Sequence, residues 1–118
     1  MKKILIVDDN KYIRFALSVL MEQSGYNGHE VGEGEKVIAE VKSKNPDLVI
    51  LDKKLPGYDG LDLLVEIKKI RQELPVIILT AYGDEKTRER ALELGADVFM
   101  TKPFDNDEII STIERLLK

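Results

Sequence analysis

Short apolar runs separated by polar stretches mark the expected strands of this chain. Each of the three strongest runs is continuously apolar, which is typical of strands buried on both faces of a parallel sheet, because a half-exposed strand would alternate. A weaker run, 98–100, and a stretch poor in strand formers, 28–31, are further candidates, and we expect the latter to be an edge strand. The three strong runs are residues 4–7, 48–51 and 76–79.

Between these runs, apolar residues recur with the period of an amphipathic helix. Ile13, Leu17 and Met21 share one face of the first such segment, and residues 109–117 carry a similar stripe. The segment 84–94 has few apolar positions and many charges, so we expect its helix to be the most weakly docked. Boundary signals support these segments: Gly25 and Gly95 as helix ends, Pro46 as a helix breaker, and Asp105 with Glu108 as a capping box.

Strand and helix patterns alternate along the whole chain, with short connections between them. Right-handed crossovers between parallel strands place helices on both faces of such a sheet. We therefore expect an α/β fold with a doubly wound parallel sheet, in a single domain that spans residues 1–118. A chain of this length buries enough apolar surface to fold without a disulfide or a structural metal.

The composition excludes several classes of function. With no cysteine and a single histidine, His29, the chain offers neither a thiolate site nor a multi-histidine metal site. The net charge is -4, and basic residues are interspersed with acidic ones, so we expect no direct nucleic-acid partner. No apolar run approaches the length of a membrane span or of a signal peptide, so we expect a cytoplasmic protein without a membrane partner.

Polar residues follow the predicted strands at the edge where an open doubly wound sheet binds its ligands. Asp8 and Asp9 follow the first strong run, Asp52 the second and Thr80 the third, and Lys102 comes just after the weaker run. Because the carboxyl ends of parallel strands share one edge of the sheet, we expect these five side chains to converge there.

Three carboxylates brought together repel one another unless a proton or a cation neutralises them, and an all-oxygen site suits a hard ion such as Mg²⁺. A bound Mg²⁺ would hold phosphoryl oxygens against Asp52 as the nucleophile, while Lys102 and Thr80 bind the other oxygens. Each residue also has an ordinary explanation: the Asp8–Asp9 pair or Thr80 as a helix cap, Asp52 as a turn residue, Lys102 as a surface lysine. The joint placement favours a site, because independent capping does not predict it.

Four segments, residues 6–10, 51–60, 79–82 and 101–104, resemble the signature segments of response-regulator receiver domains, in the same order and with similar spacing. The resemblance implies a flavodoxin-like (βα)5 fold with strand order 2-1-3-4-5. It also implies that Asp52 accepts a phosphoryl group from a histidine kinase or a histidine phosphotransfer domain. Such a domain is a signalling protein rather than a general enzyme, since it catalyses only its own phosphorylation and slow dephosphorylation.

The resemblance also implies a role for each site residue. Thr80 and Phe99 correspond to the switch positions, where Phe99 lacks the hydroxyl that a tyrosine would offer. Lys54 and Tyr82 flank the path of water to the phosphate, and the peptide bond before Pro103 is expected to be cis. The remaining roles are Mg²⁺ binding by Asp8, Asp9, Asp52 and the Lys54 backbone carbonyl, and phosphate binding by Lys102.

Two glycines depart from the family pattern. Gly28 and Gly32 lie where relatives usually have an apolar or small strand residue, so we expect a frayed second strand. The segment 32–37 superficially resembles a dinucleotide-binding fingerprint. However, it lacks the third small residue, does not follow the first strand and carries acids where a pyrophosphate would lie. We therefore reject a dinucleotide site.

Two other classes of protein compete with this interpretation. A haloacid-dehalogenase-like phosphatase also forms an aspartyl phosphate, but it has a second aspartate two residues after the nucleophile, where this chain has Lys54. A flavodoxin-like flavin-binding protein has a first loop rich in serine and threonine, whereas Asp8 and Asp9 would repel the cofactor phosphate. Both alternatives are therefore disfavoured.

The sequence ends just after the last predicted helix, so we expect a receiver without an attached output domain. Such a protein passes on its signal either by phosphorelay or by phosphorylation-dependent binding of a target protein. Lys54, Tyr82 and the run 102–105 look most like the single-domain receivers of sporulation-type phosphorelays. We therefore favour phosphorelay slightly.

Overall fold

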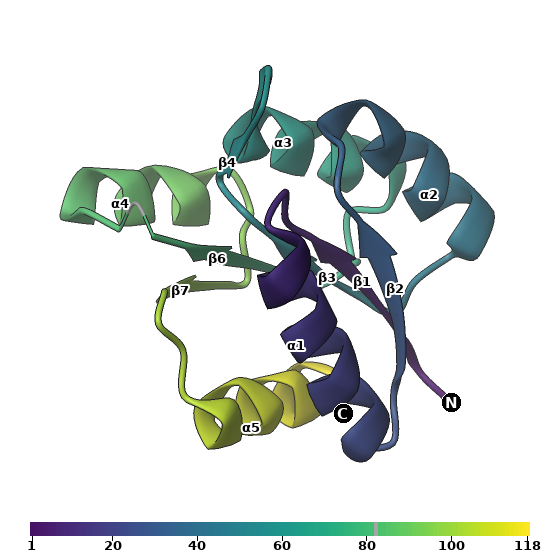
Figure 1. Cartoon of the computed structure of the whole chain (residues 1–118). Helices are drawn as coiled ribbons and strands as arrows, with labels where there is room; N and C mark the ends of the chain where they lie inside the picture. The colour runs from purple at the N-terminus through teal and green to yellow at the C-terminus, as the bar shows by residue number, and fades with distance from the viewer. Residues whose placement is uncertain (82) are drawn as a thin grey trace.

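A parallel five-stranded sheet lies between two layers of helices in the computed structural model, which describes residues 1–81 and 83–118 (Figure 1). The strand order is β2-β1-β3-β6-β7, which is 2-1-3-4-5 when only the strands of this sheet are counted. The predicted fold is therefore confirmed. The sheet consists of β1 (Lys3–Val7), β2 (Asn27–Val31), β3 (Leu48–Leu51), β6 (Val76–Thr80) and β7 (Val98–Thr101).

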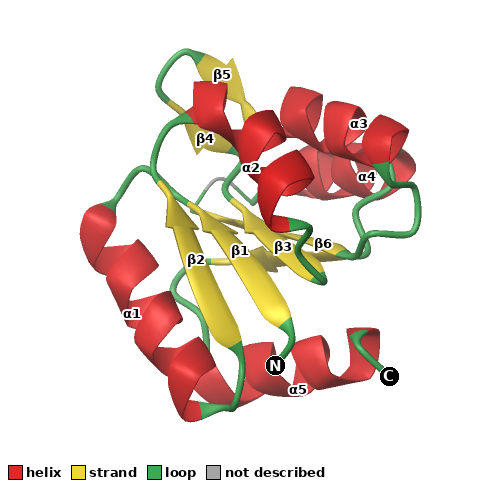
Figure 2. Ribbon diagram, turned by 90° about the vertical axis from the view of Figure 1, so that its right-hand side faces the viewer, coloured by secondary structure: helices red, strands yellow, loops and turns green. Residues whose placement is uncertain are grey.

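Helices α1 and α5 cover one face of the sheet, and α2, α3 and α4 cover the other (Figures 1 and 2). A short 3₁₀ helix, η1 (Gly34–Lys36), leads into α2. The α-helices are α1 (Lys11–Gln23), α2 (Val37–Lys44), α3 (Gly60–Ile70), α4 (Glu85–Glu93) and α5 (Asn106–Leu116).

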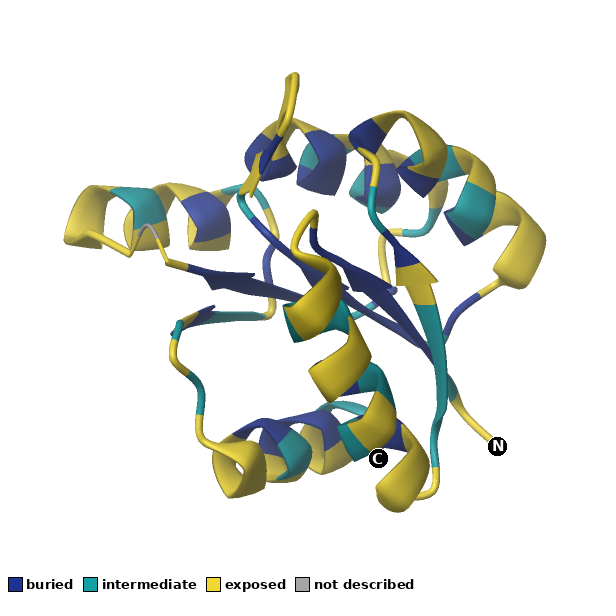
Figure 3. Cartoon of the chain, in the orientation of Figure 1, coloured by how far each residue is buried: buried dark blue, intermediate teal, exposed yellow. Residues whose placement is uncertain are grey.

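The three central strands are buried on both faces, as their continuous apolar runs predict. Leu5 and Val49 belong to the apolar cluster beneath α2, α3 and α4, whereas Ile6 and Ile50 belong to the cluster beneath α1 and α5. Figure 3 shows these central strands as buried, between helices whose outer faces are exposed. The packing fixes the positions of the strand ends, and with them the residues that follow each strand.

The second strand is not frayed, contrary to our expectation. Strand β2 pairs with β1 at all of its five residues, from Asn27 to Val31, and it forms the predicted edge of the sheet. A Cβ atom at Gly28 would lie 3.0 Å from Oγ of Ser18 on α1. The missing side chain therefore allows α1 to pack closely against β2, and this contact offsets the poor strand propensity of glycine.

Two local features differ from the sequence-based expectations. A small antiparallel hairpin, β4 (Lys54–Leu55) and β5 (Tyr58–Asp59), follows β3 directly. Thr80 is the last residue of β6 rather than the first residue after it. Both differences lie at the carboxyl ends of the strands, where the polar residues gather.

Helix α4 is the most weakly docked helix, as its charged sequence predicts. Among its residues, all of which the structure describes, only Ala91 is buried, whereas five residues of α3 are buried. Across the described part of the chain, no helix has the length and apolar character needed to cross a membrane.

Candidate functional site

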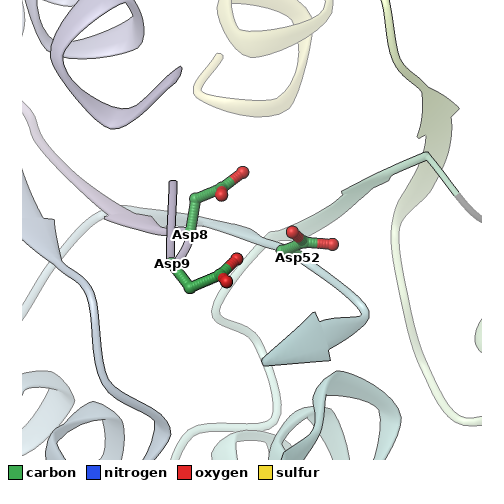
Figure 4. A group of neighbouring side chains, drawn as sticks. All are labelled: Asp8, Asp9 and Asp52. Atoms are coloured by element: carbon green, nitrogen blue, oxygen red, sulfur yellow. The ribbon is translucent and has the colours of Figure 1, made fainter. Parts of the chain in front are cut away.

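Three aspartates meet where the adjacent strands β1 and β3 end (Figure 4). Asp8 and Asp9 follow β1, and Asp52 follows β3. One carboxylate oxygen from each of the three residues lies within 4.8 Å of the other two. Asp8 is 2% exposed and Asp52 6%, whereas Asp9 is exposed. The sheet therefore holds two nearly buried acids beside a third acid that faces solvent.

Lys102 supplies a positive charge to this acidic cluster. Its Nζ atom lies 2.6 Å from Oδ2 of Asp8 and 3.1 Å from Oδ2 of Asp52. Burial alone would lower the pKa of Lys102, but the hydrogen bonds and charges of the two aspartates outweigh burial and raise the pKa above its ordinary value. The ammonium group therefore stays charged at neutral pH and joins the ends of β1, β3 and β7.

Helix capping does not explain these residues. The N-cap of α1 is Asn10, whose side chain accepts the backbone N–H groups of the first turn, so neither Asp8 nor Asp9 has that role. Asp84 caps α4 in the same way, so Thr80 is not a cap either. The side chain of Lys102 is only 14% exposed, unlike that of a surface lysine. The capping explanation for Asp8, Asp9 and Thr80 and the surface explanation for Lys102 therefore fail.

Thr80 and Lys102 are neighbours across strands β6 and β7. Thr80 is fully buried, and its carbonyl oxygen accepts the backbone N–H of Lys102 at 2.9 Å. Phe99 is half-buried on β7 and packs against the apolar cluster beneath α2, α3 and α4. The peptide bond between Lys102 and Pro103 is cis. Tyr82, the other residue that the sequence assigned to this region, lies outside the described residues.

Two local hydrogen bonds hold the loop after Asp52, one to the Asp52 side chain and one to the loop backbone. The N–H of Lys54 donates to Oδ1 of Asp52 at 3.3 Å, and the N–H of Gly60 donates to the carbonyl of Lys53. A Cβ atom at Gly60 would collide with the carbonyl oxygen of Asp52. Gly60 belongs to the signature segment 51–60, but its individual role could not be read from the sequence. The available signal was a glycine at the first residue of a helix, where helix propensity gives no reason for one.

The arrangement can bind a divalent cation. A cleft between the ends of the strands is lined by all three acids, Lys54 and Lys102, so the acids are accessible from solvent. Three carboxylates outweigh the ammonium groups of Lys54 and Lys102, which leaves a surplus of negative charge in this cleft. Because the available donors are oxygens, they fit a hard ion such as Mg²⁺.

Comparison with known proteins identifies the family. The family model described as "Response regulator receiver domain" matches residues 4–114. The chain is 40% identical to sporulation initiation phosphotransferase F of Bacillus subtilis (strain 168), covering 98% of this chain and 94% of that protein. It is 36% identical to the alkaline phosphatase synthesis transcriptional regulatory protein PhoP of the same organism, covering 99% of this chain but only 49% of PhoP. The chain thus spans about half the length of that relative.

The fold comparison agrees with the sequence comparison. A CheY-like response regulator receiver domain protein from Methanospirillum hungatei JF-1 superposes with a TM-score of 0.95 and 28% identity, over 99% of this chain and 94% of that chain. Neither the phosphatase nor the flavin-binding alternative finds support in these similarities. The matched residues, the sheet order and the cluster of aspartates agree, and the chain belongs to the family of response regulator receiver domains.

Proposed function

We propose that Asp52 is the phosphoacceptor of this receiver domain. The observation that carries the proposal is the position of its carboxylate: nearly buried, 3.1 Å from the Lys102 ammonium, and beside the two other acids in an open cleft. The fixed ammonium group and the oxygen-rich cleft together provide one place for a phosphoryl group and one for a cation.

The reaction transfers the phosphoryl group from a phosphohistidine of a histidine kinase or a histidine phosphotransfer domain. The nitrogen–phosphorus bond of the donor breaks, and an oxygen of Asp52 forms the new bond to phosphorus. Asp8, Asp9, Asp52 and the carbonyl of Lys54 would hold Mg²⁺, which supplies charge neutralisation for the phosphoryl oxygens. Lys102 then exchanges its contacts with the carboxylates for a contact with one phosphoryl oxygen. The Thr80 hydroxyl donates a hydrogen bond to a second phosphoryl oxygen.

The signal leaves the protein by phosphorelay in this proposal. Its support is the similarity to sporulation initiation phosphotransferase F, which the chain matches over 94% of that relative's length. In a relay, the bond between the Asp52 oxygen and phosphorus breaks, and the phosphoryl group passes to the histidine nitrogen of the next protein. Binding of a target protein to the phosphorylated form is the other output that a receiver domain supports.

Intact-mass measurement after treatment with acetyl phosphate tests the proposed phosphoacceptor. We expect the parent to gain one phosphoryl group in the presence of Mg²⁺ and none after EDTA treatment. Asp52→Ala is expected to gain none, whereas Asp62→Ala, an exposed aspartate of α3, serves as the control and is phosphorylated like the parent. Phosphorylation of Asp52→Ala, or phosphorylation that ignores EDTA, would exclude the assignment.

Phosphotransfer profiling identifies the partners. The purified protein is incubated with each phosphorylated histidine kinase and phosphotransfer domain of the source organism, and the fastest transfer marks the donor. The relay is then tested in the forward direction, with the phosphorylated receiver as the donor. If the phosphoryl group passes to no histidine protein, the output is target binding instead of relay.

A further inference from the structure

The backbone of Asp8 is anchored by two neighbouring elements. Its N–H donates to the carbonyl of Val31 at the end of β2, at 3.2 Å, and its carbonyl oxygen accepts a hydrogen bond from Nη1 of Arg14 at 2.7 Å. That carbonyl belongs to the peptide group that joins Asp8 to Asp9. A contact with this oxygen therefore restricts the orientation of that peptide group, from which the backbone continues into Asp9.

Arg14 is held in a narrow space between α1 and β2. Its side chain is 19% exposed, and its Nε atom lies 3.4 Å from Oε1 of Glu30 on β2. A Cβ atom at Gly32 would lie 2.6 Å from Nη1 of Arg14, which is too close for a real contact. The guanidinium group thus occupies the space that any side chain at position 32 would fill.

We propose that Arg14 is a positioning residue that aims the Asp9 carboxylate at the cation site, and that position 32 is glycine to leave room for the guanidinium group. The inference rests on the proposed function, because it concerns the binding of Mg²⁺. Asp9 is the one exposed member of the three acids, and repulsion by the other two favours its rotation into solvent. The contact from Arg14 restrains the backbone of the Asp8–Asp9 peptide group, so that the Asp9 side chain starts from a position close to the other two acids.

A purely structural role is the competing explanation, since Arg14 also ties α1 to the edge strand. Arg71 provides a matched control for that role. Its Nη1 atom donates to the carbonyl of Pro46 at 2.6 Å and also to Oδ1 of Asn45, away from the acidic cluster. Loss of either guanidinium group removes a hydrogen bond to a backbone carbonyl, but only Arg14 contacts the backbone of a site residue.

Titration of the unphosphorylated protein with magnesium chloride, followed by backbone amide NMR, measures the effect directly. We expect Arg14→Ala to raise the Kd for Mg²⁺ roughly tenfold, the lower end of the loss seen when the partners of metal ligands are removed. Arg14→Lys retains the charge and one donor, and it is expected to recover part of the affinity. Arg71→Ala is expected to bind Mg²⁺ like the parent, even where its resistance to urea falls.

Electrostatics alone predicts that Arg14→Ala lowers the Kd for Mg²⁺, whereas our proposal predicts that it raises the Kd. The sign of the change therefore decides between them. Removal of a nearby positive charge, by itself, strengthens the binding of a cation. Weaker binding by Arg14→Ala would therefore come from lost geometry rather than from changed charge. Unchanged or tighter binding would overturn the proposal.

Gly32→Ala tests the same contact without removing any polar group. The added methyl group displaces the guanidinium group, so we expect weaker Mg²⁺ binding, as in Arg14→Ala. In the Arg14→Ala background the same substitution is expected to have no further effect on Kd, because the group that it displaces is gone. Gly28→Ala, which adds a methyl group to β2 against Ser18 instead, is the control.

The outcomes separate this inference from the proposed function. If Gly32→Ala weakens Mg²⁺ binding equally in both backgrounds, its effect does not pass through Arg14 and the proposal is wrong. If the parent binds Mg²⁺ and is phosphorylated on Asp52 while both single variants bind Mg²⁺ normally, only the inference fails. If the parent binds no Mg²⁺, the proposed function fails as well. Should Arg14→Ala not fold, Gly32→Ala and Arg14→Lys still decide the question.

Discussion

Lys102 binds two of the site's acids in this structure, Asp8 and Asp52, and on phosphorylation it would exchange them for phosphoryl oxygens. We predict that Lys102→Ala is still phosphorylated but no longer couples phosphorylation to a conformational response. A charge-assisted contact of this kind contributes about 1.5–3 kcal/mol, which changes a two-state equilibrium roughly tenfold or more. Amide chemical shifts near Thr80, Phe99 and Phe104 measure the response.

Lys68→Ala is a suitable control for that prediction. Nζ of Lys68 donates to Oδ2 of Asp97 at 3.0 Å and to the carbonyl oxygen of Leu74 at 2.7 Å. Like Lys102, it holds two groups together, but none of these residues belongs to the site. This variant is expected to respond to phosphorylation as the parent does. Should the shifts in Lys102→Ala change as much as in the parent, Lys102 has no part in the coupling.

The lifetime of the aspartyl phosphate depends on two other residues. Lys54 is exposed beside Asp52, and for Tyr82 the expectation comes from the sequence alone. Both side chains are large, and neither is a carboxylate or an amide suited to activate an attacking water. We predict that the phosphate persists for minutes to hours, and that Lys54→Asn with Tyr82→Ala shortens its lifetime.

The first-order loss of phosphate, followed by intact mass in the parent and in the double variant, measures this lifetime. Each single substitution is included, so that the contribution of Lys54 is separated from that of Tyr82. A half-life of seconds in the parent, or a double variant that loses phosphate no faster than the parent, would show that these side chains do not shield the phosphoryl group.

The acids and Lys102 could be predicted as a group because the ends of parallel strands share one edge of a sheet. Asp52 and Lys102 are 50 residues apart in the chain, yet each directly follows a strand of the same parallel sheet. Gly60 and Arg14 could not be predicted in this way. Their contacts are with backbone carbonyl oxygens, and no pattern of side-chain types along the sequence reveals which carbonyl lies within reach.

At the scale of elements, continuous apolar runs identified the central strands because burial on both faces leaves no alternation. The hairpin of β4 and β5 was missed, since each of its strands has two residues and neither carries a periodic pattern. The glycine in β2 gave a wrong expectation for a different reason. Strand propensity describes a single residue type, whereas the close approach of Ser18 to Gly28 arises only when α1 packs against β2.

Helix α4 should open more readily than the other helices of the described chain. Only Ala91 anchors it in the core, while Leu64 and Ile67 of α3 are fully buried. We predict that backbone amides of α4 exchange with deuterium faster than those of α3 under native conditions, because local opening exposes little apolar surface. Residue-resolved hydrogen exchange measures both helices in one sample, and equal protection in α3 and α4 would contradict the prediction.

At the scale of the whole molecule, the apolar core stabilises the fold, whereas repulsion among the three aspartates destabilises it. Packing on both faces fixes the ends of β1 and β3, so the backbones of Asp8, Asp9 and Asp52 stay close together while the chain is folded. Unfolding relieves their repulsion, and Lys102 compensates for only part of it. Repulsion among the three aspartates therefore lowers the free energy of unfolding of the protein.

This conflict predicts that Mg²⁺ and Asp9→Asn each raise the unfolding temperature of the ion-free protein, and that their effects do not add. A ligand that binds only the folded state stabilises it by about 2.7 kcal/mol at a hundred times its Kd. For a domain of this size, such a change raises the Tm of the parent by roughly 10 °C. Without Mg²⁺, Asp9→Asn should unfold at a higher temperature than the parent, because one of the three repelling charges is gone.

With Mg²⁺ present, the order should reverse, since Asp9→Asn has lost a ligand and gains little from the ion. Asp62→Asn removes the same charge from an exposed position on α3 and controls for the change in net charge. Calorimetric scans of the three proteins in EDTA and in magnesium chloride test both halves of the argument. If Asp9→Asn is less stable than the parent in EDTA, repulsion at the strand ends does not limit the stability of the fold. If Mg²⁺ stabilises Asp9→Asn as much as the parent, Asp9 is not a ligand.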